Sequence, residues 1–337
     1  MNGGSGPVAV ASPERVTDQT ELLAAMRLVS VPPAEREGAA RRLLAAGPRH
    51  GIDFTHAWAV IDRAPGGEPR LVRQVCLAVP GSGRTAMVFL SDPVGGAEPG
   101  GPEVAKAERA ACIQAAAADM ATLVDAGGAR RVAVMQALPE PREAWSIEAC
   151  HAAGFVTVGH LTYMRASVPP LKRQPPAPTG PFPAGVEVVS VASIPAARRE
   201  AVLVEALERS YEETLDCPEL CGMRETRDIL ESHRCTGVHD PSMWWVVFDG
   251  SSPRGTMMLA HVPDQHAVEL VYLGLSPDVR GKGLGRRLMA MAMRATAAAR
   301  IGEMTCAVDT RNVPAVRLYE SCGFAGFAQR VALVKSL

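Results

Sequence analysis

The hydrophobic pattern between residue 184 and the end of the chain predicts a regular series of strands and helices. Strands are expected at 186–191, 243–248, 255–262, 267–275, 304–308 and 331–334. Helices are expected at 196–215, 224–233, 284–299 and 314–322. The helix at 284–299 shows the clearest periodicity, because apolar residues recur at three- and four-residue intervals. Strands connected as hairpins come first, and a strand–helix–strand–helix–strand series follows. This order predicts an α/β fold in which helices cover both faces of a mixed, mostly antiparallel sheet.

The first half of the chain repeats this order. Residues 131–155 and 304–324 each contain a β-type run, a proline-containing turn, a helical stretch and a Gly-Phe pair. The pairs Gly154-Phe155 and Gly323-Phe324 lie 169 residues apart, which is half of the 337-residue chain. An alanine-rich helical stretch precedes each pair and a strand-like run follows it. The sequence therefore predicts two copies of one unit.

A proline-rich segment separates the two copies. Seven of the sixteen residues from 169 to 184 are proline, a composition that is typical of an extended, semi-rigid linker. The predicted organisation is a first domain at 1–168, a linker at 169–184 and a second domain at 185–337.

Composition excludes several classes of function. Hydrophobic residues make up 47% of the chain and charged residues 21%, values typical of a globular protein rather than a disordered one. The net charge of −1 provides no general attraction to nucleic acid or to an anionic membrane. Aromatic residues make up only 4%, too few for a platform that stacks single-stranded bases. Neither nucleic acid nor a membrane is therefore expected as a partner.

The termini and the cysteines indicate a cytoplasmic protein without a metal. No apolar run approaches the roughly 20 residues that span a bilayer, and the N-terminus shows no pattern typical of a signal peptide. The eight cysteines include no C-x-x-C pair, which favours reduced thiols. Cys217, Cys221, Cys235 and His239 are close in sequence, but their spacing fits no common zinc site, so we expect no metal.

The loop that follows the predicted strand 267–275 has the most distinctive chemistry. Glycines alternate at positions 281, 283 and 285, and six Arg or Lys residues but no acidic residue occur between Val279 and Ile301. Glycines let backbone N–H groups approach a ligand, and a helix N-terminus favours an anion. The pattern predicts a pyrophosphate cradle, although a glycine turn before a solvated basic helix has the same composition. The spacing fits neither a nucleotide P-loop nor a dinucleotide-binding fingerprint.

With these motifs, the sequence resembles the GNAT superfamily of acyl-CoA-dependent N-acyltransferases. The resemblance rests on the loop at 280–285, on the strand that precedes it, and on Asn312, Ala315, Leu318, Tyr319, Glu320 and the Gly323-Phe324 pair. It covers residues 184–337 strongly and the first half weakly, as in tandem members of the superfamily such as the mycothiol synthases. It implies two tandem GNAT-like domains, the first of them degenerate.

The resemblance implies acetyl-CoA as the acyl donor and assigns the residues that bind it. Backbone groups of Leu273, Gly274 and Leu275 would pair with the pantetheine arm. The pyrophosphate would be held by Arg280, Gly281, Lys282, Gly283, Leu284, Gly285 and Arg286. Asn312 would contact the coenzyme, or it would only cap the following helix. Gly274 in a strand also indicates close backbone approach or a bulge, or simply close packing.

Two residues are candidates for catalysis. Glu269 lies in a strand that is apolar on both faces, where burial would raise its pKa and make it a better base. The alternative is a glutamate that faces solvent at an edge. The resemblance implies that Tyr319 protonates the departing CoA thiolate, whereas the alternative is a tyrosine in the core.

An acidic segment after the helix at 196–215 is the candidate acceptor region. Tyr211, Glu212 and Asp216 would suit an amine, although a solvated helix end would have the same composition. The corresponding loop of the first copy carries Glu98 and Glu103, and Cys150 aligns with Tyr319. We therefore expect the first copy not to bind CoA.

The sequence predicts an N-acetyltransferase that transfers acetyl directly to a small-molecule primary amine at one active site in the second half. A scaffold that binds acyl-CoA without turnover and an enzyme that acetylates a protein or peptide amine are the alternatives. The oligomeric state and the identity of the amine are not encoded in any motif.

Overall fold

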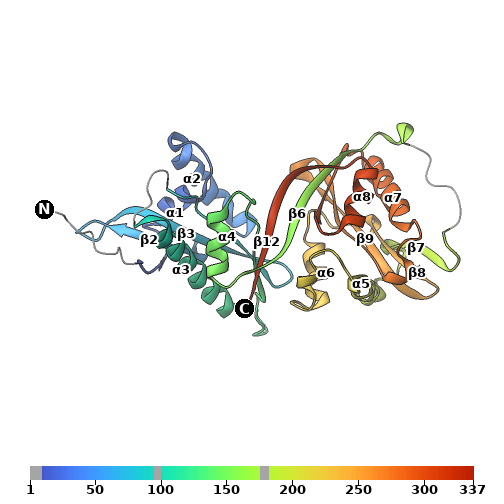
Figure 1. The fold of residues 1–337 in the computed structure, drawn as a ribbon, viewed down its shortest axis with the longest axis horizontal. Coiled ribbons are helices and arrows are strands. Elements are labelled where there is room, and N and C mark those ends of the chain that lie inside the picture. Colours follow the sequence, from blue (N-terminus) through green and yellow to red (C-terminus); the bar gives the residue numbers. More distant parts are fainter. Residues whose placement is uncertain (1–9, 95–99, 175–181) are drawn as a thin grey trace. The chain divides into compact units, whose positions relative to one another are not determined.

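The computed structural model describes residues 10–94, 100–174 and 182–337, and it contains two compact units (Figure 1). Unit 1 comprises Met1–Thr157 together with Val331–Leu337, and unit 2 comprises Val158–Arg330. Seven of the sixteen residues of the predicted linker, residues 175–181, lie outside the described residues. None of the helices in the described part of the chain has the length and apolarity that crossing a bilayer requires.

Unit 1 is a mixed sheet with helices packed against it. Its strands lie in the order β1-β2-β3-β4-β5-β12, and all of its neighbours are antiparallel except β4 and β5. The strands are β1 (Glu14–Arg15), β2 (Ala57–Arg63), β3 (Pro69–Gly81), β4 (Thr85–Leu90), β5 (Val134–Ala137) and the end of β12 (Ala325–Ser336). The helices are α1 (Glu21–Leu28), α2 (Arg36–Ala46), α3 (Gly101–Thr122) and α4 (Ala144–Ala152).

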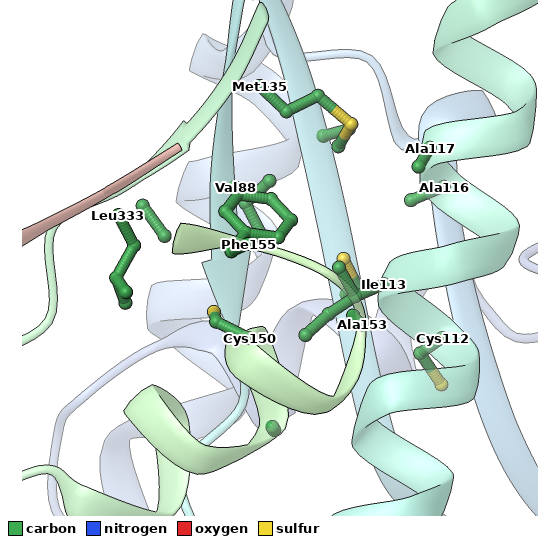
Figure 2. Packing of buried hydrophobic residues seen from close by; sticks show 14 of the residues in the cluster. Val88, Cys112, Ile113, Ala116, Ala117, Met135, Cys150, Ala153, Phe155 and Leu333 are labelled. Atoms are coloured by element: carbon green, nitrogen blue, oxygen red, sulfur yellow. The ribbon is translucent and has the colours of Figure 1, made fainter. Parts of the chain in front are cut away.

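The last strand of the chain contributes to the core of unit 1. Figure 2 shows Leu333 of β12 in a cluster with Val88 of β4, Met135 of β5, Ile113 of α3 and Phe155. Leu333 and Ile113 are fully buried. The last strand of the chain therefore closes a core that is otherwise built from residues of the first half.

Unit 2 repeats the arrangement of a mixed sheet with helices packed against it. From one edge, its strands lie in the order β6-β11-β10-β9-β8-β7. They are β6 (Val156–Ser167), β7 (Val186–Ser190), β8 (Trp244–Asp249), β9 (Ser252–Val262), β10 (Ala267–Leu275) and β11 (Glu303–Asp309). The helices are α5 (Ala196–Tyr211), α6 (Thr226–Arg234), α7 (Leu284–Ala298) and α8 (Val313–Ser321).

Two cores hold the helices of unit 2 against its sheet. Leu288 and Met289 of α7 and Tyr319 of α8 pack on one face with Val268, Leu270 and Met304. Leu203 and Leu207 of α5 and Leu230 of α6 pack with Trp244 and Met258 in the other cluster. The apolar stripes that the sequence places on these helices are the surfaces that they bury.

The mixed α/β fold predicted from the sequence is confirmed, and β10 has the predicted bounds. The compact units differ from the predicted domains at the strands that end each half. β6 follows the first copy in sequence but pairs with β11 of unit 2, and the end of β12 pairs with β5 of unit 1. Hydrophobic patterning predicts a strand but not its partner, which is why the sequence did not reveal this exchange.

Candidate active site

The centre of the unit 2 sheet opens into a cavity. β10 and β11 are parallel, but they pair only at Val268–Met304 and Glu269–Thr305. Beyond this point β10 continues beside β9, and β11 continues beside β6. A cavity of about 340 Å³ is lined by the end of β10, by Ala307 of β11, and by residues of α8 and of the segment that follows α5. A ligand that enters there would meet a sheet edge whose hydrogen-bonding groups are not used by a neighbouring strand.

The predicted cradle lies at the mouth of this cavity. Gly281 and Gly283 adopt φ angles of 72° and 77°, a region that other residues rarely occupy. A Cβ at either position would meet no atom within 4 Å, so these glycines serve the backbone conformation and leave the surface open. Gly283 caps α7, and no side chain satisfies the first N–H groups of that helix. Lys282 and Arg286 are exposed beside it, so the site has the donors and charge that bind an anion.

The next two residues of the loop, Leu284 and Gly285, pack against other parts of the protein. Leu284 is buried in the core. Gly285 packs so closely on α8 that a Cβ would lie 2.9 Å from Leu318 Cδ2. A second hollow of about 460 Å³ runs between the loop and α8, lined by Gly283, Gly285, Arg286, Pro314, Arg317, Leu318 and Ser321.

Arg280 joins the loop to the acceptor region. Its guanidinium donates to the carbonyl oxygens of Leu275 at 2.7 Å, Glu212 at 2.7 Å, and Ser210 and Glu213 at 3.1 Å. These contacts satisfy carbonyl groups at the C-terminus of α5, where a cation is favoured. The side chain of Arg280 is therefore engaged with the backbone, whereas Lys282 and Arg286 are directed to solvent.

The strand that lines the cavity depends on a glycine. Leu273, Gly274 and Leu275 all line the cavity. A Cβ at Gly274 would lie 2.7 Å from Cε1 and Cζ of Tyr272, so the Tyr272 ring occupies the space where a side chain at position 274 would lie. The Tyr272 hydroxyl forms a 2.7 Å hydrogen bond with Ser210 Oγ. The strand does contain a bulge, but it falls between Leu270 and Tyr272 rather than at Gly274.

Glu269 lies at the point where the two strands diverge. It is half-buried, and within the described residues its carboxyl group has no hydrogen-bond or ion-pair partner. Burial raises its pKa above the ordinary value of 4.5. A carboxylate with a raised pKa is a stronger base, which is what proton removal from an ammonium group requires.

Tyr319 faces the cavity from α8. Its side chain is only 6% exposed, it lines the cavity, and its ring packs on Phe324 with centroids 5.8 Å apart. Burial raises its pKa well above 10, so the hydroxyl keeps its proton at neutral pH. Among the described residues the hydroxyl has no hydrogen-bond partner, so it is available to a ligand. Asn312 also lines the cavity, and its Oδ1 accepts a hydrogen bond from Ala315 N at 3.3 Å as the cap of α8.

Two of the three predicted acceptor residues, Tyr211 and Asp216, line one wall of the cavity, whereas Glu212 does not line it. Tyr211 lines it, and its ring contacts Tyr272 edge-to-face with centroids 6.0 Å apart. Glu212 is exposed, and its carbonyl oxygen is one that Arg280 binds. Asp216 lines the cavity and accepts a hydrogen bond from Asp309 N at 2.8 Å. Desolvation raises the pKa of Asp216, although the hydrogen bond opposes this change.

An ion-pair cluster that the sequence did not reveal fixes this wall to β11. Asp309 is fully buried, and its carboxylate accepts hydrogen bonds from the Arg311 guanidinium and from Cys217 N. Arg311 also binds both carboxylate oxygens of Glu219, at 2.6 and 2.8 Å. Burial alone would raise the pKa of Asp309, but these hydrogen bonds hold it below its usual range. The signal in the sequence was Asp309 followed two residues later by Arg311, a pattern that is common in turns.

The described part of unit 1 differs from unit 2 at the positions that correspond to Tyr319 and to the cradle. Cys150, which aligns with Tyr319, is fully buried in the core shown in Figure 2. Glu103 forms an ion pair with Lys106 at 2.6 Å, and Glu98 lies outside the described residues. Within the parts of the chain that the structure describes, no three His, Cys, Asp or Glu side chains converge as metal ligands.

Comparison with known proteins places this site in a family. Residues 204–324, which include β10, α7, β11 and α8, match the Acetyltransferase (GNAT) family. The mycothiol acetyltransferase of Mycobacterium marinum is 29% identical over 194 residues, covering 52% of this chain and 56% of that protein. The mycothiol acetyltransferase of Beutenbergia cavernae is 36% identical over 90 residues, covering 26% of this chain and 30% of that protein. The matched segments thus span less than two thirds of either relative.

The fold comparison extends over both units. The crystal structure of a GCN5-related N-acetyltransferase from Sphaerobacter thermophilus aligns with 96% of this chain and 94% of its own, with a TM-score of 0.57 and 17% identity. The match of residues 204–324 to the family model supports a GNAT-type acetyltransferase domain in this part of the chain. Because the alignment covers 96% of this chain, the likeness in fold includes residues of unit 1 as well as unit 2.

Proposed function

We propose that this chain is an acetyl-CoA-dependent N-acetyltransferase that acts on the primary amine of a small molecule at one site in unit 2. The observation that carries the proposal is the divergence of β10 from β11 directly beside the uncapped, basic N-terminus of α7. The family of residues 204–324 supports acyl transfer. The match to mycothiol acetyltransferases supports a small-molecule acceptor rather than a protein.

The residues of the cavity suit the two halves of acetyl-CoA. The edge of β10 at Leu273–Leu275 offers backbone groups to an amide-containing arm, apart from the Leu275 carbonyl oxygen, which accepts a hydrogen bond from Arg280. The N–H groups at Gly281–Arg286 would bind the diphosphate. The cavity of about 340 Å³ has the size of an ordinary small-ligand site. The chain supplies positioning and charge, and the thioester supplies the reactive carbonyl.

The proposed chemistry assigns one proton to each side chain. Glu269 accepts the proton of the acceptor ammonium, and the free amine attacks the thioester carbonyl. The carbon–nitrogen bond forms and the carbon–sulfur bond breaks. Tyr319 then gives its proton to the departing thiolate, and it regains a proton from the attached nitrogen, which must lose a second proton to become an amide. A buried, protonated tyrosine and a carboxylate of raised pKa are the protonation states that these roles need.

A covalent acyl-cysteine fits the site less well. Cys306 is buried next to Tyr319, and burial raises its pKa to about 12. A thiol with this pKa is almost entirely protonated at neutral pH and is a poor nucleophile. Direct transfer to the amine is therefore the proposed route.

The experiment is a measurement of amine-dependent CoA release. CoA is quantified by chromatography, because the exposed thiols of Cys221 and Cys235 would react with a thiol reagent. The double variant Lys282→Glu/Arg286→Glu reverses two exposed charges at the cradle. We expect its KM for acetyl-CoA to rise at least about tenfold, since charge-assisted contacts to phosphate are among the stronger ones.

The matched control is Arg70→Glu/Arg198→Glu, which changes the net charge equally at exposed positions outside the cavity. Its KM should stay close to the native value. Equal KM values for the two double variants would contradict the proposed cradle. Binding of acetyl-CoA without amine-dependent CoA release would indicate a non-catalytic scaffold instead.

A further inference from the structure

An aromatic and basic patch lies on the sheet of unit 2 beside Glu269. Residues that are paired across strands share a face of the sheet, so Glu269 of β10, Thr305 of β11 and Arg165 of β6 form one row. Ala307 and Tyr163 are paired in the next row on the same face. Ala307 also lines the cavity, so the patch continues directly from it.

Phe327 covers the far end of this row. The Arg165 guanidinium lies 5.3 Å from the centre of the Phe327 ring, and the Tyr163 ring meets the same ring edge-on at 6.4 Å. Phe327 is 50% exposed, and Arg165 is exposed. A large aromatic side chain held in contact by two neighbours yet open to solvent is typical of a binding surface rather than of a core.

The charges of the patch change sign along the row. Glu269 is at one end, and Arg165 lies two strands away, roughly 10 Å between Cα atoms. Arg330 is close enough to lower the pKa of Tyr163, whereas Glu269 and, above all, burial raise it. Tyr163 is therefore near both the Glu269 carboxylate and the Arg330 guanidinium. In the described part of the chain, Arg165 contacts no carboxylate.

We propose that Arg165, Phe327 and Tyr163 bind the acceptor, and that this acceptor carries an anionic group, a carboxylate or a phosphate, about 5–10 Å from its amine. The inference rests on the proposed function and names the class of its second substrate. The amine would reach Glu269 beside the cavity, the middle of the molecule would lie along Thr305 and Ala307, and the anion would meet the guanidinium of Arg165. The aromatic ring of Phe327 holds that guanidinium in place.

The test compares acceptors that differ only in the anion. One pair is 6-aminohexanoate and its neutral amide, 6-aminohexanamide, and the other is glucosamine 6-phosphate and glucosamine. The two pairs separate a carboxylate from a phosphate. For native protein we expect kcat/KM to be at least about tenfold higher with one anionic amine than with its neutral partner.

Variants locate the source of this preference. Arg165→Gln should abolish the preference and leave the KM for acetyl-CoA unchanged, and Phe327→Leu should reduce it. Arg198→Gln, which removes an exposed charge from α5, should retain it. Equal kcat/KM for charged and neutral acceptors, or a preference that survives in Arg165→Gln, would overturn the inference.

A binding readout separates failure of this inference from failure of the proposed function. Saturation-transfer NMR of 6-aminohexanoate and glucosamine 6-phosphate is recorded with native protein and with Arg165→Gln. If none of the four amines leads to CoA release, the proposed acetyl transfer fails for these acceptors, yet transfer of saturation that Arg165→Gln abolishes would still place an anionic amine at the patch. Equal signals from both proteins, or no signal from native protein, would contradict the patch whether or not acetyl transfer occurs.

Discussion

Glu269 is both a candidate base and a source of instability. Its carboxyl group is desolvated and unpaired among the described residues, and its pKa in the folded protein is raised above 4.5. A raised pKa means that the folded state favours the protonated form. The stabilisation from that protonation is fully present below pH 4.5 and is lost as the pH rises through the raised pKa.

Replacing the Glu269 carboxyl group should therefore lower the activity and raise the stability of the folded protein. We expect Glu269→Gln to lower kcat by roughly 100-fold or more, because the base is lost. Near pH 7 the same variant should melt at a higher temperature than native protein, and the difference should vanish below pH 4.5. Thermal unfolding at both pH values checks this, and a lower melting temperature at pH 7 would show that the carboxylate has a stabilising partner.

The same reasoning gives the pH dependence of the reaction. Because a base must be deprotonated to act, kcat/KM should rise with pH through a value above 4.5 that belongs to Glu269. In Glu269→Gln this step should disappear. A profile in which the step persists in the variant would assign it to another group.

Tyr319 should affect turnover without affecting folding. Its hydroxyl has no hydrogen-bond partner in the described structure, so Tyr319→Phe should leave the free energy of unfolding unchanged. We expect kcat to fall roughly 100-fold as the proton donor is lost. Tyr272→Phe is the matched control, since it removes a hydrogen bond to Ser210 and should cost about 1 kcal/mol of stability. A Tyr319→Phe enzyme with native kcat would assign the tyrosine to the core alone.

Single residues show where the sequence was informative. The glycines at 281 and 283 and the isolated Glu269 were identifiable because each departs from what a plain strand or helix requires. Arg280 was grouped with the phosphate-binding residues, whereas its side chain binds carbonyl oxygens at the end of α5. Sequence shows charge but not direction, and this is also why the Asp309–Arg311–Glu219 cluster was not predicted.

Among the secondary-structure elements, the connection between α5 and β10 depends on Arg280. Four carbonyl oxygens from two elements accept its hydrogen bonds. We expect Arg280→Gln to lower the free energy of unfolding by about 2 kcal/mol and to raise the KM of the amine, since the wall formed by Tyr211 and Asp216 loses its anchor. Chemical denaturation and steady-state kinetics measure the two effects. A free energy of unfolding equal to that of native protein would contradict this role of Arg280.

The pattern of hydrophobic residues predicted the bounds of β10, α7 and α8 almost to the residue, because each element has a regular hydrophobic periodicity and a clear boundary residue. The divergence of β10 from β11 did not follow from the pattern of residues, because periodicity does not say where two strands separate. Gly274 was expected to mark a close approach. The structure shows that it makes room for Tyr272, while the bulge lies three residues earlier, at Val271.

At the scale of the whole chain, the strand pairing predicts which fragments can fold. The strand that ends the first half, β6, pairs in unit 2, and the end of β12 pairs in unit 1. β11 pairs with β6 over seven residues, and Arg311 donates to Val158 O. A chain of residues 185–330 lacks β6, so β11 would become an unpaired edge in the middle of the site. We expect residues 158–330 to be soluble and to bind acetyl-CoA, and residues 185–330 to aggregate. Equal solubility and binding by both would show that β6 is dispensable.

The central claim is that one of the two similar units binds the coenzyme, at the cradle before α7. Calorimetric titration of acetyl-CoA into the full chain tests it most directly, with Lys282→Glu/Arg286→Glu titrated in parallel. We predict one site per chain, with binding at least about tenfold weaker in the double variant. Two sites per chain, or unchanged binding by the double variant, would contradict the claim.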